Sequence, residues 1–549
     1  MKKPTPGRLE VERQELEAIL ERARSAPLSG EDYTTLKSAV DTLSWLTREL
    51  EAKGTSIERL RRMLFGPSTE KTSRILPAEP ATSSGDTTAP AEPDADGPPR
   101  KKRPGHGRHG AQSFTGAEKV TVSHESLAHG DPCPACERGK VYRQLDPARL
   151  LRITGMAPLQ AKVYELERLR CNLCGQVFTA AAPAGAGTSK YDETAAAMIA
   201  LLKYGSGVPF YRLQKLEQSL GIPLPAATQW ELVRDGAAAL APAYAELIRQ
   251  AAQGEVLYND DTTMKILKLE RPLPAEPEDP ADARTGSFTS GIVATAGGQR
   301  VALFFTGWRH AGENLSRLLA QRARDLSPPI QMCDGLSHNN TSEEFKTILA
   351  NCMAHARRRF VDVRGSFPDE CRYILEELGQ VYHHDALARQ QGLSAAERLA
   401  YHQEHSGPVM TGIETWLAEQ LNGHLVEPNS GLGEAIRYMQ KHWQKLTRFL
   451  HVAGAPLDNT ICERALKRAI LHRKNALFYK TENGARVGDL FMSLIHSAEL
   501  CGADPFDYLV TLLRRAKWVA QAPADWMPWN YRDALGHDGD VKATPSANS

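Results

Sequence analysis

The middle of the chain, from about residue 255 to 335, carries short apolar runs with the composition of β-strands. These runs are rich in β-branched and aromatic residues, and glycine-containing connections separate them: EVLYND (255–260), SGIVATA (290–296), RVALFF (300–305) and SPPIQMCD (327–334). A helical pattern over roughly 312–324 lies between the third run and the fourth. Three strands, a helix and a fourth strand predict a mixed α/β sheet.

Most of the remaining chain has the spacing of helices. From about 190 to 250, leucines share one face until Gly221 interrupts the pattern, and a second helix is expected to start near Ala226. This outline fits a helix-turn-helix, and an ordinary helical hairpin fits it equally well. Helices are also expected over most of 341–450, 459–475 and 487–518, followed by a frayed polar tail from about 533.

The N-terminal segment predicts a coiled coil. Its apolar positions recur every seven residues, at Leu36, Leu43, Leu50, Ile57 and Leu64. Such a repeat favours a left-handed supercoil and self-association; the alternative is an amphipathic helix that packs within its own chain. Residues 75–99 are rich in proline, alanine, serine and acids, and they predict a flexible linker.

The length and net charge of the chain limit its possible domain organisation and its possible contacts with DNA. With 549 residues the chain exceeds the ~250–300 at which a single core stops growing, so several domains are expected. The formal net charge of +1 means that any contact with DNA must come from local basic patches. No apolar run has the length of a membrane span, and the start MKKPTPGRLE has no apolar signal region, so a cytoplasmic protein is expected.

Two CxxC pairs form the clearest local motif. Each pair is followed closely by a glycine, and thiolates at this spacing predict a closed, structural zinc site on Cys133, Cys136, Cys171 and Cys174. The segments 141–145 and 161–171, between the pairs, predict the strands of a zinc-ribbon hairpin. Unrelated free thiols or a redox pair are the alternatives.

Acids in three separate segments are candidates for a catalytic metal site. Asp260 and Asp334 each end a predicted strand, Asp261 adjoins the first, and Glu463 lies in a predicted helix. Mg²⁺ prefers carboxylate ligands, and two metals about 3.5–4 Å apart can assist both the attacking and the leaving oxygen of a phosphodiester. The alternatives are a capping box of Thr460 with Glu463, an ion pair with the lysine one turn later, and turn-capping aspartates.

Basic residues lie near several of these motifs and suit a phosphate backbone. Candidates for DNA contact are Arg62, Lys101, Lys102, Arg103, Arg108, Arg357, Arg358, Arg464, Lys467, Arg468, Arg473 and Lys474, and His472 belongs to the last cluster. Solvated surface charge is the alternative. Cys352 and His355 precede three arginines, and this pair makes no zinc site without two more ligands.

Taken in order, these motifs resemble the insertion-sequence-66 family of bacterial transposases over most of the chain. The segments RRMLFGPSTEK (61–71), PGHGR (104–108) and VPFYRLQKL (208–216) and the paired CxxC motifs each resemble a family element. The most specific likenesses are CMAHARRRFVD (352–362), similar to the family's CWAHARRKF.D block, and LDNTICERALKRAILHRKNALF (457–478), similar to its DN..AERALR....GRKN.LF block.

The resemblance implies a ribonuclease-H-like core in which two aspartates and a glutamate bind Mg²⁺ or Mn²⁺. These residues fall on Asp260, Asp334 and Glu463, with Cys352 and His355 inside a helical insertion of about 341–450. The chain departs from the family after each aspartate, at 262–265 and 335–340, but it keeps the acids. The expected fold class is multidomain α/β, with a mixed-sheet core preceded by a coiled-coil helix, a zinc ribbon and a helix-turn-helix-like domain.

The expected domains follow this order along the chain. They are a helical and coiled-coil segment (1–74), a linker with a basic arm (75–112), the zinc ribbon (113–185), a helical DNA-binding domain (186–253), the catalytic domain (254–518) and a C-terminal tail (519–549). The implied function is Mg-dependent cleavage at terminal inverted repeats and strand transfer into target DNA. We expect a homo-oligomer associated with the nucleoid, small accessory proteins encoded by the same element, and no membrane partner.

Two other classes of function remain open at this point. One is a catalytically inactive or domesticated DNA-binding regulator that keeps the zinc ribbon, coiled coil and basic arm. The other is a nuclease selective for branched DNA. Metal-dependent cutting, and its dependence on the flanking DNA sequence, distinguish the three.

Overall fold

In the computed structural model, the residues described are 13–24, 27–40, 121–143, 157–183, 186–187 and 189–540, with gaps at 137, 171, 173, 175 and 270–285. The chain divides into a unit of Glu79–Pro158 and a unit formed by Met1–Ala78 and Leu159–Ser549. The second unit holds nearly all of the regular secondary structure that is described.

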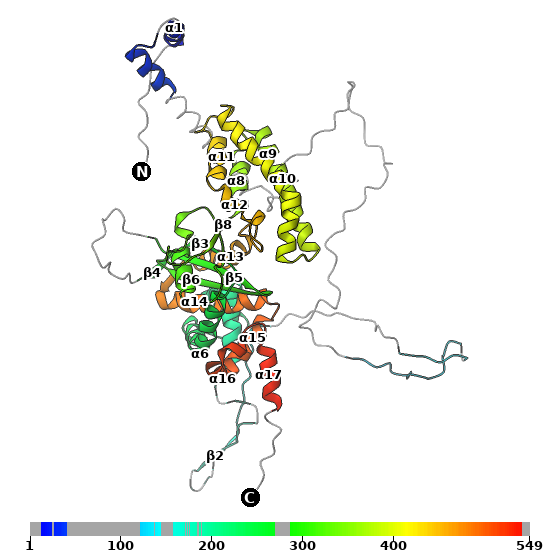
Figure 1. Cartoon of the computed structure of the whole chain (residues 1–549). Coiled ribbons are helices and arrows are strands. Elements are labelled where there is room, and N and C mark those ends of the chain that lie inside the picture. Colours follow the sequence, from blue (N-terminus) through cyan, green and yellow to red (C-terminus); the bar gives the residue numbers. More distant parts are fainter. Residues whose placement is uncertain are drawn as a thin grey trace, which may run out of the picture. The chain divides into compact units, whose positions relative to one another are not determined.

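A five-stranded mixed sheet forms the centre of the larger unit (Figure 1). β3 (Val256–Thr263) is its middle strand, antiparallel to β5 (Phe288–Ala296), which is antiparallel to the edge strand β6 (Gln299–Gly307). On the other side β3 runs parallel to β7 (Ile330–Cys333), and β7 runs parallel to β8 (Ile348–Asn351). The mixed sheet and its four predicted strands are therefore confirmed.

The prediction of helix throughout 341–450 is wrong at β8, because a four-residue strand is too short to show a period in the sequence. A second small pairing was also not predicted. β4 (Ile266–Lys268) lies parallel to β9 (Tyr479–Thr481), and this pair ties the end of the first strand segment to the C-terminal helices.

Helices cover the sheet because its central strands are apolar on both faces. In β5, six consecutive residues are buried, which is the pattern of a strand packed on both sides. Among the helices that share one core with the sheet are α6 (Ala226–Ala252), α7 (Ala311–Leu319), α13 (Thr460–Ala476) and α14 (Glu482–Leu500). The helix predicted over roughly 312–324 is confirmed, although it begins at Ala311 and ends at Leu319.

The free edge of β6 is closed by side chains of α14 rather than by another strand. Ser497 accepts a hydrogen bond from the N–H of Ala302 (2.9 Å), and Ser493 accepts one from the N–H of Phe304 (3.0 Å). Asp489, one turn earlier on the same face, accepts from the N–H of Thr306 (2.7 Å). An exposed edge strand is a template for aggregation, so this helix protects the sheet.

A second, helical core packs against the β7 and β8 side of the sheet, as the predicted insertion requires (Figure 1). Its helices are α8 (Met353–Val363), α9 (Pro368–Gln390), α10 (Ala395–Asn422), α11 (Gly431–Lys441) and α12 (Trp443–Leu446). The buried carboxylate of Asp385 in α9 joins this helix to α10, with hydrogen bonds from Arg398 and His402 of α10.

The helix pair predicted between 190 and 250 is confirmed. After α4 (Glu193–Ala200) and the π-helix η2 (Leu201–Gly205), α5 (Phe210–Ser219) ends before Gly221, whose φ of 79° favours glycine. α6 then continues for 27 residues and packs on the sheet, so α5 and α6 belong to the same core as the strands. A DNA-binding role for this helix pair stays a prediction.

Predictions for the two ends of the chain have different outcomes. α1 (Arg13–Ala23) and a helical stretch at 30–40 are described, whereas most of the heptad repeat and the linker lie outside the described residues. At the C-terminus, α15 (Pro505–Arg514) lies in the segment predicted as helix, whereas α16 (Ala516–Gln521) and α17 (Tyr531–Asp540) reach into the expected tail. The fraying expected from about 533 is wrong up to 540, because α17 continues to that residue; Val519, Trp526, Met527 and Tyr531, just before this point, are buried in the main core.

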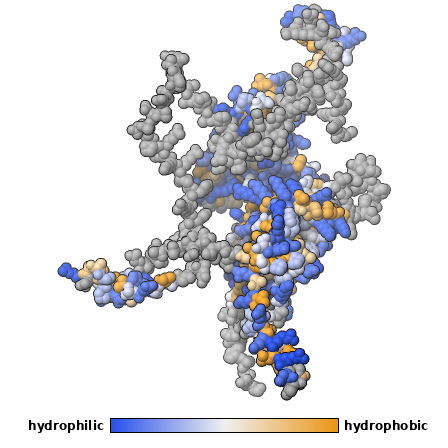
Figure 2. All heavy atoms as spheres, turned by 180° about the vertical axis from the view of Figure 1, so that it is seen from behind, coloured by the Kyte–Doolittle hydropathy of each residue, from blue (hydrophilic) through white to orange (hydrophobic). Residues whose placement is uncertain are grey.

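The hairpin expected between the cysteine pairs is confirmed at one strand only. β1 (Arg168–Arg170) lies within the predicted strand 161–171, but it pairs with β2 (Val177–Thr179), so their hairpin encloses the second CxxC pair. The other predicted strand, 141–145, lies partly outside the described residues. None of the helices that the structure describes is both long and apolar enough to cross a membrane. The face shown in Figure 2 is mostly hydrophilic, with scattered apolar patches.

Candidate active site

The register of two parallel strands brings the predicted aspartates together. Val256 pairs with Ile330 and Tyr258 with Met332, so Asp260 and Asp334 occupy equivalent positions two residues further along. Neighbouring strands lie about 4.8 Å apart, and equivalent positions point to the same face. Asp334 is buried, and its Oδ1 accepts hydrogen bonds from the Asn339 side chain (2.6 Å) and the N–H of Leu336 (3.1 Å).

Glu463 reaches the same place from the first turn of α13. The side chain of Asn459, just before the helix, donates to the carbonyl of Asn259 in β3 (3.0 Å). On the next strand, a Cβ at Gly291 would lie 2.9 Å from Leu466 of α13, so glycine permits the close approach of the helix. The capping-box alternative for Glu463 is wrong, because α13 already begins at Thr460 and has no side-chain cap.

The pKa of Asp260 depends on the charges of the other two acids. Burial, together with the charges of Asp334, Glu463 and Asp261, raises the pKa of Asp260 to about 7, although the hydrogen bond from the N–H of Asp261 opposes the shift. Oε1 of Glu463 is buried and has no hydrogen-bond partner. Three hard oxygen donors that repel one another, one of them unpartnered, fit a divalent cation.

Asp261 makes different contacts from its neighbour Asp260. Its Oδ1 accepts from the hydroxyl of Ser290 (2.8 Å), and its Oδ2 accepts from the N–H of Ala311 (3.0 Å) and contacts Nδ1 of His310 (2.8 Å). Asp261 therefore anchors the start of α7 to β3. This contact was not predicted, since nothing in the sequence links positions about fifty residues apart.

The structure brings Cys352 and His355 to the glutamate. One ligand atom from each of Cys352, His355 and Glu463 lies within 4.8 Å of the other two, with 3.6 Å between His355 Nδ1 and Glu463 Oε1. Arg358 is 4.0 Å from the other carboxylate oxygen. Burial raises the pKa of the Cys352 thiol to about 12, so it stays protonated, and its sulfur accepts the N–H of Asn459.

The predicted DNA-contact residues of α13 fall into two groups. Arg464, Lys467 and Lys474 are exposed. Arg468 instead bonds to Glu499, and Arg473 bonds to the Thr263 side chain and carbonyl at the end of β3.

His472 was grouped with the basic residues, and that grouping is wrong. It is buried, and burial, with the charge of Lys203, lowers its pKa to about 3, so the ring is uncharged. Arg357 is also buried, whereas Arg358 is exposed in part beside Glu463. The remaining DNA-contact candidates lie outside the described residues: Arg62, Lys101, Lys102, Arg103 and Arg108.

Three of the four predicted zinc ligands lie among the described residues. Cys133 and Cys136 share a tight turn in the smaller unit, where the N–H of Cys133 donates to the carbonyl of Gly139 (2.8 Å). The N–H groups of Arg138 and Gly139 lower the pKa of the Cys136 thiol, as suits a metal thiolate. Cys174 is exposed in the larger unit, and Cys171 lies outside the described residues, so the four-sulfur site stays a prediction.

Comparison with known proteins identifies the family. The family model described as "Transposase IS66 family" matches residues 188–487. Over 526 residues the chain is 28% identical to the uncharacterized protein y4jD of Sinorhizobium fredii, covering 92% of this chain and 99% of the relative. A second uncharacterized protein of that organism, y4hP, is 25% identical over 515 residues, 87% of this chain and 88% of the relative. The matched region includes the whole sheet and all three acids, and the chain belongs to the IS66 family of transposases.

Proposed function

We propose that this protein is a DNA transposase that cuts the ends of a mobile element and joins them to target DNA. The observation that carries the proposal is the convergence of Asp260, Asp334 and Glu463, from two parallel strands and one helix, on a site where their charges interact. The family membership supplies the reaction class. The site supplies residues of the right chemistry for it.

The three carboxylates would hold the divalent metal that the family implies. Such a metal supplies Lewis-acid activation of the attacking oxygen and stabilisation of the leaving oxygen in phosphodiester chemistry. Asp260 is suited to this role because its side chain accepts only the N–H of Asp261, whereas both oxygens of Asp261 have partners. Asp260, rather than Asp261, is the proposed ligand.

Residues around Glu463 position it and hold DNA. His355 and Arg358, both from α8, approach the two oxygens of the Glu463 carboxylate and limit its rotation. Further along α13, the helix of Glu463, Arg464 and Lys467 are exposed and available for phosphate contact. One metal-binding acid and bases that bind phosphate thus share this helix.

Plasmid nicking tests the proposal. Purified protein is incubated with Mg²⁺ or Mn²⁺ and a plasmid that carries the DNA flanking its own gene, beside Asp334→Asn protein. We expect nicks that map to the flanking repeats with the wild type and none with the variant. Binding to the repeats without any cut, with and without the neighbouring gene products, would favour the regulator; nicking of branched DNA regardless of sequence would favour the nuclease.

A further inference from the structure

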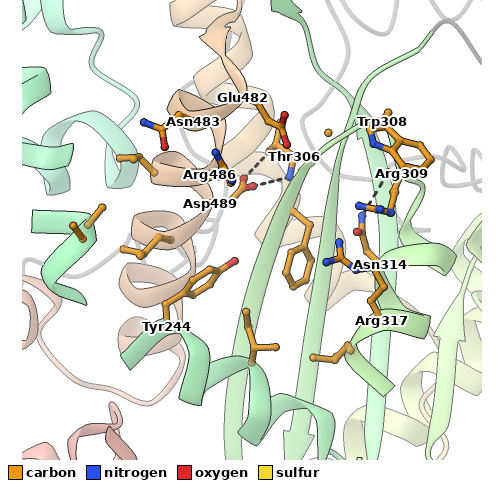
Figure 3. A pocket seen from close by; sticks show the side chains of 18 of the residues that line it. Tyr244, Thr306, Trp308, Arg309, Asn314, Arg317, Glu482, Asn483, Arg486 and Asp489 are labelled. Atoms are coloured by element: carbon orange, nitrogen blue, oxygen red, sulfur yellow. Dashed lines mark hydrogen bonds between the residues drawn. The ribbon is translucent and has the colours of Figure 1, made fainter. Parts of the chain in front are cut away.

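A cavity of about 590 Å³ lies beside the sheet, apart from the three acids (Figure 3). Its walls come from α6, from the last residues of β6 with the loop that follows, from α7, and from the first turns of α14. The volume falls within the ~300–1,000 Å³ typical of small-ligand sites. The pairing of Asp489 with Thr306 forms part of the wall (Figure 3).

The cavity is lined with more positive than negative charge. Arg486 extends from α14 on one side, and Arg309 and Arg317 come from the segment around α7 on the other (Figure 3). Among the residues that the structure describes, none of these three arginines forms an ion pair. Burial and the charge of Arg317 lower the pKa of Arg309, although the charges of Glu313 and Glu482 oppose this shift, so the two arginines disfavour each other. Guanidinium groups held close together favour an anion, and their planar donors match phosphate.

The acids of the lining do not cancel this charge. Asp489 is fully enclosed, and its two oxygens accept from the N–H and the hydroxyl of Thr306. Burial raises the pKa of Asp489 to about 8, so the group is largely neutral at physiological pH. Glu482 is the other acid among the lining residues that the structure describes.

An aromatic surface lies next to these cations. The guanidinium of Arg309 lies 4.4 Å from the ring centroid of Trp308, a cation–π contact, and both side chains are partly exposed. Phe305 and Tyr244 add apolar wall. Single-stranded nucleic acids are bound by this combination, because bases stack on aromatic rings while arginines hold the backbone.

The sheet register relates the cavity to the strand that carries the first acid. Asp261 pairs with Ser290, and Ser290 pairs with Phe305, so the cavity wall lies two strands, about 10 Å, from β3, on the face of the sheet to which Asp261 points and opposite to the face of Asp260. The chain also connects the cavity directly to the neighbour of the first acid. His310, which follows Arg309, contacts Asp261, the neighbour of Asp260.

We propose that this cavity binds one nucleotide unit whose base has left its stack, with the base against Trp308 and the phosphate against Arg309 and Arg486. The proposal rests on the function proposed above, since the nucleotide would belong to DNA that the protein holds at the acids. A free mononucleotide has the same base and phosphate as a nucleotide within DNA, and the test distinguishes these two ligands.

The test measures binding of full-length protein in EDTA to a short fluorescein-labelled oligothymidylate by anisotropy. Trp308→Ala should weaken binding by about 5- to 100-fold, the range expected for one lost base–aromatic stack, and Trp308→Phe should restore most of it. Arg486→Ala should also weaken it. Arg300→Ala is the matched control, an exposed arginine at the opposite end of β6, and should change binding little.

Competition with dAMP identifies the source of the nucleotide. If dAMP displaces the labelled strand from the wild type but not from Trp308→Ala, the cavity binds a free nucleotide. If binding depends on Trp308 and dAMP does not compete with it, the cavity binds a nucleotide within DNA. Equal affinities of wild type, Trp308→Ala and Arg486→Ala, in proteins with unchanged melting temperatures, would overturn the proposal. Nicking is measured separately: a protein that nicks its flanking repeats but shows equal affinities refutes only the cavity, and one that does not nick refutes the transposase.

Discussion

Replacing Asp260 by asparagine should stabilise the metal-free protein. Burial and the charges of Asp334 and Glu463 raise the pKa of this carboxyl from 3.8 to about 7. The folded state therefore retains a proton that the unfolded state has lost, and the wild type loses stability as the pH rises from about 4 to about 7. A shift of about 3 units at ~1.4 kcal/mol per unit gives about 4 kcal/mol above pH 7.

The asparagine variant avoids this penalty and keeps the backbone contact. Its side-chain oxygen still accepts the N–H of Asp261, which lies 2.8 Å from the carboxylate oxygen in the wild type. Melting in EDTA should show a variant that matches the wild type near pH 4 and becomes progressively more stable up to about pH 7. Added Mg²⁺ should raise the melting temperature of the wild type and leave the variant nearly unchanged.

The adjacent aspartate provides the control. Asp261→Asn should destabilise the protein at every pH above 4, by about 1–3 kcal/mol, since an amide cannot accept all the hydrogen bonds of Asp261. If Asp260→Asn is no more stable than the wild type at neutral pH, or if the difference between them does not depend on pH, the three acids do not interact as described.

Three further variants test other parts of the fold by thermal or denaturant unfolding. Asp385→Ala should lower the free energy of unfolding by about 3–5 kcal/mol, because it leaves Arg398 and His402 facing an empty site. Although burial raises the pKa of Asp385, these partners lower it to about 2, so the stability that Asp385 contributes should disappear as the pH falls from about 4 towards 2. Equal losses of stability in this pH range for the wild type and Asp385→Ala would contradict this. His472→Phe should be neutral or stabilising, since both ring nitrogens are buried without partners and the ring stacks on Tyr479; a clear loss of stability would show an unrecognised partner. Gly291→Ala should reduce both stability and nicking, because its Cβ would lie 2.9 Å from Leu466 and push α13 away from β3; normal nicking would show that the helix position is not critical.

Sequence reasoning predicted the elements of the core better than their contacts. The strands around Asp260 and Asp334 and the helix of Glu463 were predictable, since apolar runs and helical periods are local signals. β8 was missed because four residues show no period, and the strand at 161–171 near the cysteines was given the wrong partner.

The functional surroundings of the acids depend on contacts between distant residues. The approach of His355 to Glu463 spans more than a hundred positions, and the contact of His310 with Asp261 joins a helix start to a strand. His472 looked basic by composition, but its burial against Tyr479 could be known only from the packing. The cavity beside Trp308 left no sequence signal, because its lining comes from four separate elements.

Metal-dependent cleavage of flanking DNA by Glu463→Gln protein tests the central claim most directly. Glutamine keeps the size of the side chain and removes the charge that the site needs for a divalent cation. Glu499→Gln, which alters the exposed partner of Arg468 away from the acids, serves as the control. The account predicts that Glu463→Gln folds, binds DNA and does not cut, while Glu499→Gln cuts like the wild type; cleavage by Glu463→Gln at the wild-type rate would contradict it.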